Sequence, residues 1–86
     1  MTVRNNTFEL EVHEVASSFG LSARETEILH AICAGLKIKE FAASAKIANE
    51  TARKQLKSML RKLGVGYQMD AVRLVYRMYV EERIAA

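Results

Sequence analysis

Hydrophobic residues recur along the chain three or four positions apart, which is the spacing of an amphipathic α-helix. In the first segment Phe8, Val12 and Val15 share one face, and they predict a helix over about residues 7–19. Gly20 follows where glycine commonly ends helices, because it tolerates a positive φ. The chain is therefore expected to begin with one helix that ends at Gly20.

A second helix begins at a recognisable start signal. Residues 22–25 (Ser-Ala-Arg-Glu) have the form of a capping box, in which a serine and a glutamate three positions later bond each other's backbone amides. Ile28, Leu29 and Ile32 then form an apolar stripe, and Gly35 is expected to end the helix.

Two further helices are separated by only a short turn. The first spans about residues 38–45, and the second runs from residue 49 or 50 to residue 63, with residues 46–48 between them. The apolar stripe of the second helix is Ala52, Leu56, Met59, Leu60 and Leu63. Its other face holds Arg53, Lys54, Lys57 and Arg61. Two closely joined helices, of which the second has an exposed basic face, predict a helix-turn-helix.

The last helix, over about residues 68–83, is apolar around almost its whole circumference, with Arg73 and Arg77 as its main polar strip. Such a helix must be covered on more than one side. A domain this small is expected to cover one side with its own core. A second copy of the chain is therefore the favoured cover for the other side, and a missing neighbouring domain is the alternative.

Composition supports an all-α domain and narrows its setting. The 86 residues include no proline and four glycines, so few positions interrupt a helix. Cys33 is the only cysteine, which excludes a disulfide framework, fits a reducing compartment and predicts a small core residue. No apolar stretch approaches the ~20 residues that cross a bilayer. A soluble, cytoplasmic protein with no membrane partner is expected.

The positive charge is concentrated in one region. Residues 1–35 carry two Lys or Arg against five Glu, a net charge of −3. Residues 36–77 carry ten Lys or Arg against three Asp or Glu, a net charge of +7. This distribution is typical of a protein that binds a polyanion such as nucleic acid, although a solvated basic face has the same composition.

Several segments resemble, in order and spacing, the LuxR-type DNA-binding domain, also called the GerE family. They are LSARETEIL (21–29), GLKIKEFA (35–42), TARKQ (51–55), LRKLGV (60–65) and AV (71–72). The resemblance extends over residues 21–84, about three-quarters of the chain. It implies a four-helix helix-turn-helix module over residues 21–86. The extra helix of residues 1–20 is then either a linker helix or the beginning of a single-domain regulator.

Proteins of that family are bacterial transcription regulators whose module binds pseudo-palindromic DNA as a dimer. The resemblance therefore implies double-stranded DNA as partner, a homodimer through the C-terminal helix and no cofactor, with RNA polymerase as a further candidate partner. The positions that correspond to base contacts are Arg53, Lys54 and Lys57. Those that correspond to phosphate or supporting contacts are Lys39, Thr51, Arg61 and Lys62, with Glu50 beside them. Those on the dimerisation helix are Val72, Val75, Tyr76 and Tyr79.

The sequence departs from the family pattern at the start of the recognition helix. Ala48 stands where the family has a serine that caps this helix, so Asn49 is expected to take over with a one-residue shift. Gln55 replaces the usual histidine and Ala52 the usual valine. Glu50 is suited to the helix dipole and to accepting a hydrogen bond from cytosine N4, but it would also repel phosphate.

Other chemistry is weakly indicated. His13 and His30 lie seventeen residues apart on separate helices, without the acidic company expected of a metal site, so no metal site is expected. The chain has no nucleophile–base pair or phosphate-binding glycine loop, and an enzyme is not expected. Met59, Met69 and Met78 are expected in the core. Two alternatives to an operator-binding dimer are a promoter binder like region 4 of a sigma factor and a helix-turn-helix module used for protein–protein interaction, such as an anti-activator.

Overall fold

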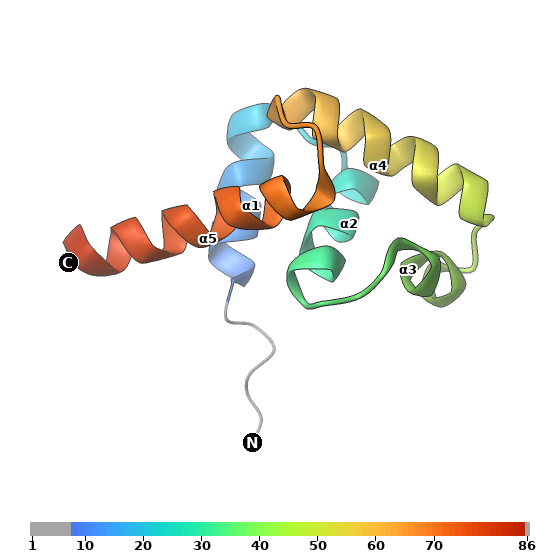
Figure 1. Cartoon of the computed structure of the whole chain (residues 1–86), viewed down its shortest axis with the longest axis horizontal. Helices are drawn as coiled ribbons and strands as arrows, with labels where there is room; N and C mark the ends of the chain where they lie inside the picture. The colour runs from blue at the N-terminus through green and yellow to red at the C-terminus, as the bar shows by residue number, and fades with distance from the viewer. Residues whose placement is uncertain (1–7, 86) are drawn as a thin grey trace, which may run out of the picture.

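The computed structural model describes residues 8–85, and for residues 82–85 it describes only the backbone. This part of the chain forms five helices, shown in Figure 1: α1 (Glu9–Phe19), α2 (Ala23–Cys33), α3 (Ile38–Ala45), α4 (Asn49–Leu63) and α5 (Gln68–Ala85). No strand occurs among the described residues, so the all-α prediction is confirmed. Every predicted helix is present, and its ends lie close to those expected.

The start and stop signals between α1 and α2 act as the sequence predicts. Gly20 has a left-handed φ of 68° and ends α1, with its amide bonded to the carbonyl of Ala16. The Ser22 hydroxyl then accepts a hydrogen bond from the Glu25 amide at 3.1 Å, and the Glu25 carboxylate accepts one from the Ser22 amide at 2.8 Å. The capping box is confirmed, and it fixes where α2 begins.

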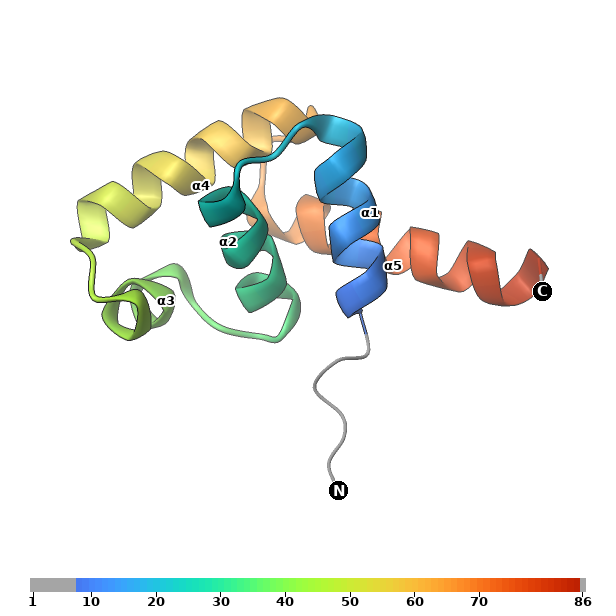
Figure 2. The same cartoon turned by 180° about the vertical axis from the view of Figure 1, so that it is seen from behind.

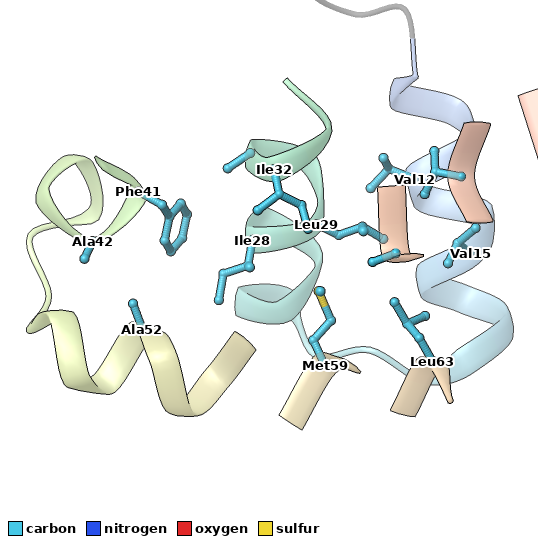
Figure 3. Close-up of a cluster of buried hydrophobic side chains, with 13 residues drawn as sticks. Val12, Val15, Ile28, Leu29, Ile32, Phe41, Ala42, Ala52, Met59 and Leu63 are labelled. Atoms are coloured by element: carbon cyan, nitrogen blue, oxygen red, sulfur yellow. The ribbon is translucent and has the colours of Figure 1, made fainter. Parts of the chain in front are cut away.

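The core is built around α2, which contacts each of the other four helices. Figure 3 shows side chains of α1, α3 and α4 converging on Ile28, Leu29 and Ile32 of α2. The largest fully buried side chains come from α1, α2, α4 and α5: Val12, Val15, Ile28, Leu29, Met59 and Val75. One hydrophobic cluster therefore includes residues of all five helices, so α1 shares a single core with the helices that follow Gly20.

Helix α1 covers part of α5, and this changes the expectation that one whole side of α5 needs a cover from outside the chain. α1 packs against both α2 and α5, so the chain itself covers α5 on two sides near the core. Beyond α1, the C-terminal part of α5 projects away from the other helices (Figures 1 and 2). The inference that a second side of α5 must be covered from outside therefore applies only to this projecting part.

The methionines and the cysteine that were predicted to lie in the core differ in how deeply they are buried. Met59 is fully buried and Met78 is half-buried against the core, as expected. The prediction is wrong for Met69, which is 60% exposed. Ala71 is buried, and a residue two positions away lies on the opposite side of a helix. Burial raises the pKa of the Cys33 thiol to about 11, which suits a packing role.

Candidate nucleic-acid interface

Helices α3 and α4 are held together by small buried side chains. Ala42 of α3 is 3% exposed and Ala52 of α4 is fully buried, and in Figure 3 the two side chains point toward each other. Phe41, on the neighbouring position of α3, points toward α2. Small residues allow two helices to approach closely, and the larger Phe41 fixes the pair on the core.

The turn between the two helices has a defined conformation. Lys46 ends α3 with a left-handed φ of 60°, and its amide bonds to the carbonyl of Ala43 at 3.2 Å. The Ile47 amide bonds to the carbonyl of Ala42 at 3.0 Å. Ala48 is extended, with φ −64° and ψ 144°, and α4 begins at the next residue. Residues 46–48 therefore form the short turn that the helix-turn-helix prediction requires.

Helix α4 begins without a side-chain cap. Ala48 is its N-cap residue, and its side chain has no hydroxyl or amide group. The prediction that Asn49 takes over as the capping residue is therefore wrong. Asn49 is already the first helical residue, where its side chain is no longer placed to accept from the second or third amide. The first-turn amides of α4 are thus left to solvent or to a ligand.

The exposed face of α4 carries a straight stripe of charged residues. Glu50, Lys54, Lys57 and Arg61 follow one another at i, i+4, i+7 and i+11, a spacing that keeps them on one side of a helix. All four are exposed, as is Arg53 on one flank of the stripe. The buried residues Ala52, Met59 and Leu63 lie on the opposite side.

The cations of this face have no anionic partner within the described residues. Ion pairs in this part of the chain join Arg24 to Glu27, Lys62 to Glu25 and Arg73 to Asp70. None of them involves Arg53, Lys54, Lys57 or Arg61. Their positive charge is therefore available to an external anion.

A buried carboxylate fixes the other flank of α4. Glu25 is 5% exposed, and its carboxylate accepts hydrogen bonds from the Ser58 hydroxyl at 2.7 Å and from Lys62 Nζ at 2.9 Å. Burial alone would raise the pKa of Glu25. The bonds from the Ser22 amide, Lys62 and Ser58, with the charge of Lys62, outweigh burial and lower the pKa to about 2.

This network changes the interpretation of Lys62. The ammonium group also lies 3.4 Å from the carbonyl oxygen of Gly20, so Lys62 joins the end of α4 to the end of α1 as well as to the first turn of α2. Of the two roles expected for Lys62, the supporting one has a partner in the structure. Ser58, one turn before it, was not singled out from the sequence, although the i, i+4 spacing of two polar residues beside an apolar stripe is a usable signal.

The remaining predicted contact residues are exposed around the helix-turn-helix. Lys39 lies in the first turn of α3 and Thr51 in the first turn of α4. Glu40 accepts a hydrogen bond from the Lys37 amide at 2.7 Å and so stabilises the start of α3. Lys39 and Thr51 are accordingly accessible at the N-terminal ends of α3 and α4.

The residues predicted for a dimer interface lie in different environments. Val75 is fully buried in its own chain, so its prediction as an interface residue is wrong. Val72 is half-buried, and Tyr76 is 54% exposed. Phe8, just before α1, makes edge-to-face contacts with Tyr79 at 5.1 Å and with Tyr76 at 6.2 Å between ring centroids. These tyrosines thus contact the N-terminal segment, which sequence reasoning did not anticipate.

The two histidines lie closer together than their separation in sequence suggests. His13 and His30 line one small groove between α1 and α2, of about 150 Å³, together with Glu9 and Glu27. They therefore do have acidic neighbours in space. Even so, no group of three or more His, Cys, Asp or Glu residues among the described ones is arranged to hold a metal ion.

The α3–turn–α4 unit with an unpaired basic face defines a helix-turn-helix module of the nucleic-acid-binding class. The family model GerE, described as bacterial regulatory proteins of the luxR family, matches residues 20–75, about two-thirds of the chain. The chain therefore belongs to the luxR family of bacterial regulatory proteins, and its helix-turn-helix is a DNA-binding domain of that family rather than part of an enzyme family. No curated protein and no solved structure gives a significant match. In residues 8–85 no helix is long and apolar enough to span a bilayer.

Proposed function

We propose that this chain is a sequence-specific transcription regulator that inserts α4 into the major groove of operator DNA. The observation that carries the proposal is the exposed stripe of α4, whose cations have no ion-pair partner among the described residues. An α-helix fits the major groove, where lysine and arginine can reach guanine O6 and N7 as well as the flanking phosphates. Membership of the luxR family supports the same mode of binding.

Within this mode the residues of α4 divide by position. Arg53, Lys54 and Lys57 are proposed to contact base edges, and Arg61, nearer the end of the helix, to contact phosphate. Glu50 lies on the same stripe as Lys54 and Lys57, where it can accept a hydrogen bond from cytosine N4.

Lys39 and Thr51 are proposed as phosphate contacts at the helix ends. Lys62 is proposed to act indirectly, because its bond to Glu25 helps to fix the orientation of α4.

We further propose that the regulator binds a pseudo-palindromic operator as a homodimer. The projecting part of α5 is the proposed contact, because Tyr76 is 54% exposed and Val80 is only half-buried there. Val72 and Tyr79 lie beside this surface and complete the proposed interface. A two-fold axis through the paired α5 helices would present one recognition helix to each half-site.

The test of DNA binding is a salt titration with random-sequence duplex DNA, in which fluorescence anisotropy measures the affinity at each salt concentration. A nucleic-acid surface predicts a steep linear fall of log affinity with log salt, with a slope of about −0.9 for each phosphate neutralised. Lys57→Ala should in addition weaken binding to a selected operator by about 1–3 kcal/mol and relax its base preference. Arg73→Ala removes one positive charge outside α4 and serves as the matched control. Absence of binding at low salt, or an equal effect of the two variants, contradicts the proposal.

The test of the dimer is sedimentation velocity at several protein concentrations. Tyr76→Glu introduces a charge that a dimer would bury without a partner, so it should shift the population toward the monomer. The exposed residue Tyr67, outside the proposed interface, gives the control Tyr67→Glu. A wild-type chain that sediments as a monomer at every concentration refutes the proposed interface.

A further inference from the structure

A groove runs along the flank of α4 beside its DNA-facing stripe. It has a volume of about 410 Å³ and lies between α4 and the loop that follows it. Leu56 and Leu60 of α4 and Val65 of the loop line it. Each of these three side chains is only half-buried: one edge packs against the core and the other borders the groove. Aliphatic surface is therefore exposed directly beside the proposed DNA contacts.

The rim of this groove is positively charged. Arg53, Lys57 and Arg61 line it at i, i+4 and i+8, and no acidic residue does. None of the three has an ion-pair partner within the described part of the chain. The rim extends over the nine residues from Arg53 to Arg61, which is about 12 Å along the helix axis or about two helical turns.

DNA accounts for the cations of this groove but not for its aliphatic lining. Phosphates gain little from contact with leucine and valine, and the apolar groups that DNA offers in the major groove are single thymine methyl groups among polar base edges. An amphipathic helix with an apolar stripe between two rows of carboxylates matches both features, because such helices bind grooves through apolar residues at i, i+4 and i+7. A second copy of this chain fits poorly. Its acidic helix α1 already uses Val12 and Val15 in its own core and leaves only Leu10 exposed among its aliphatic residues.

We propose that this groove binds an acidic amphipathic helix of a protein partner. Because Lys57 and Arg61 belong both to the groove and to the DNA-facing stripe, the partner and DNA exclude each other. The inference rests on the proposed function, in that the partner regulates the DNA-binding helix. The groove gives this chain a site at which a protein controls access to its recognition helix.

The test uses the full chain and a synthetic peptide of about 15 residues, long enough to form a helix when bound. The peptide has leucines at i, i+4 and i+7 with glutamates on both flanks, and a scrambled peptide of identical composition is the control. We expect binding of the first peptide only, competition with duplex DNA, and amide shifts in the NMR spectrum confined to α4 and residues 65–66. Equal binding of the scrambled peptide, no binding, or shifts located elsewhere overturns the proposal.

Two variants separate the groove from the DNA surface. Leu56→Gln removes lining and should weaken peptide binding by about fivefold to tenfold while changing DNA affinity by less than about twofold. Lys54→Ala lies on the stripe but outside the groove, and it should show the opposite pattern. Circular dichroism establishes that each variant is folded, and the NMR mapping tests the groove without any variant. If Leu56→Gln weakens DNA binding as much as peptide binding, the groove is part of the DNA surface and the inference fails. If the peptide binds as expected but DNA does not, the proposed function fails and the groove remains.

Discussion

The most informative single change in this domain is Glu25→Gln. It removes one negative charge from a carboxylate that joins the first turn of α2 to the last turns of α4, and it keeps the shape of the side chain. The amide oxygen can still accept from the Ser22 amide. Lys62 loses its counter-charge, and because 40% of its side chain is exposed, water can replace part of that interaction.

The magnitude follows from the pKa of Glu25. Its ordinary value of 4.5 falls to about 2 in the folded state, and this difference corresponds to about 3 kcal/mol of stabilisation. Because the folded pKa is the lower one, the contribution is complete above pH 4.5 and is lost as the pH falls toward 2. A domain of 86 residues has a free energy of unfolding of about 4–13 kcal/mol in total. Glu25→Gln should therefore lower stability near neutral pH by about 2–3 kcal/mol.

The assay is urea unfolding at a series of pH values, with circular dichroism as the measure of the folded fraction. The difference in free energy of unfolding between wild type and Glu25→Gln should be largest near neutral pH and should vanish as the pH approaches 2. Glu27→Gln is the matched control, because Glu27 is 61% exposed in its pair with Arg24 and should cost less than about 0.5 kcal/mol. If the wild-type and Glu25→Gln curves stay parallel down to the lowest pH, the charge of Glu25 is not what stabilises the fold.

Two further predictions concern the helix-turn-helix itself. Ala48→Ser should raise the free energy of unfolding by about 1 kcal/mol, because its hydroxyl supplies the cap that α4 lacks; no gain in urea unfolding would mean that the first-turn amides are already satisfied. Lys46→Gly should raise it by about 1 kcal/mol, because Lys46 holds a left-handed φ of 60° that glycine adopts without strain. Glycine at the neighbouring helical residue Ala45 is the control and should instead destabilise by about 1 kcal/mol.

The features that could be predicted from the sequence are those encoded within a few neighbouring residues. The capping box of Ser22 and Glu25 joins positions three apart, and the apolar stripe of α4 repeats at the helical period. Both depend on local backbone geometry alone, so their residue types and spacing suffice. The charged stripe of α4 belongs to the same category, because burial of Ala52, Met59 and Leu63 determines which face of α4 remains exposed.

The start of α4 shows where local reasoning is insufficient. Ala48 and Asn49 are both compatible with the helical pattern, and residue preference alone favours Asn49 as the cap. The conformation of the turn between α3 and α4 instead makes Ala48 the N-cap residue. Lys46 is left-handed and Ile47 bonds back to Ala42, which directs the chain so that Ala48 is extended and Asn49 already helical.

Contacts between distant residues were the least predictable. Glu25 and Lys62 are 37 positions apart, and the sequence offers Glu25 several other cations of equal chemistry. Only the packing of α2 against α4 selects Lys62. The same holds for Phe8, whose edge-to-face contacts with Tyr76 and Tyr79 depend on α1 lying across α5.

The position of α1 raises the question of where the folding unit of this protein begins. The luxR family match starts at residue 20, yet Val12 and Val15 of α1 are 1% and 0% exposed in the same core as Val75 of α5. A chain that begins at Gly20 would lose both valines and would expose the part of α5 that they cover. Burial of a valine stabilises by about 1.5 kcal/mol or more, so the loss should be on the order of 3 kcal/mol.

We therefore predict that residues 20–86 alone unfold at a markedly lower temperature than the full chain and bind a hydrophobic dye such as ANS. A version of the full chain with Leu10→Ala is the control, because Leu10 is 76% exposed and contributes nothing to the core. Equal thermal stability of the fragment and the full chain would show that α1 is a linker that rests on the domain. The expected result would instead make α1 an integral part of this regulator's fold, because without it α5 lacks the cover that leaves only its projecting part free for a partner.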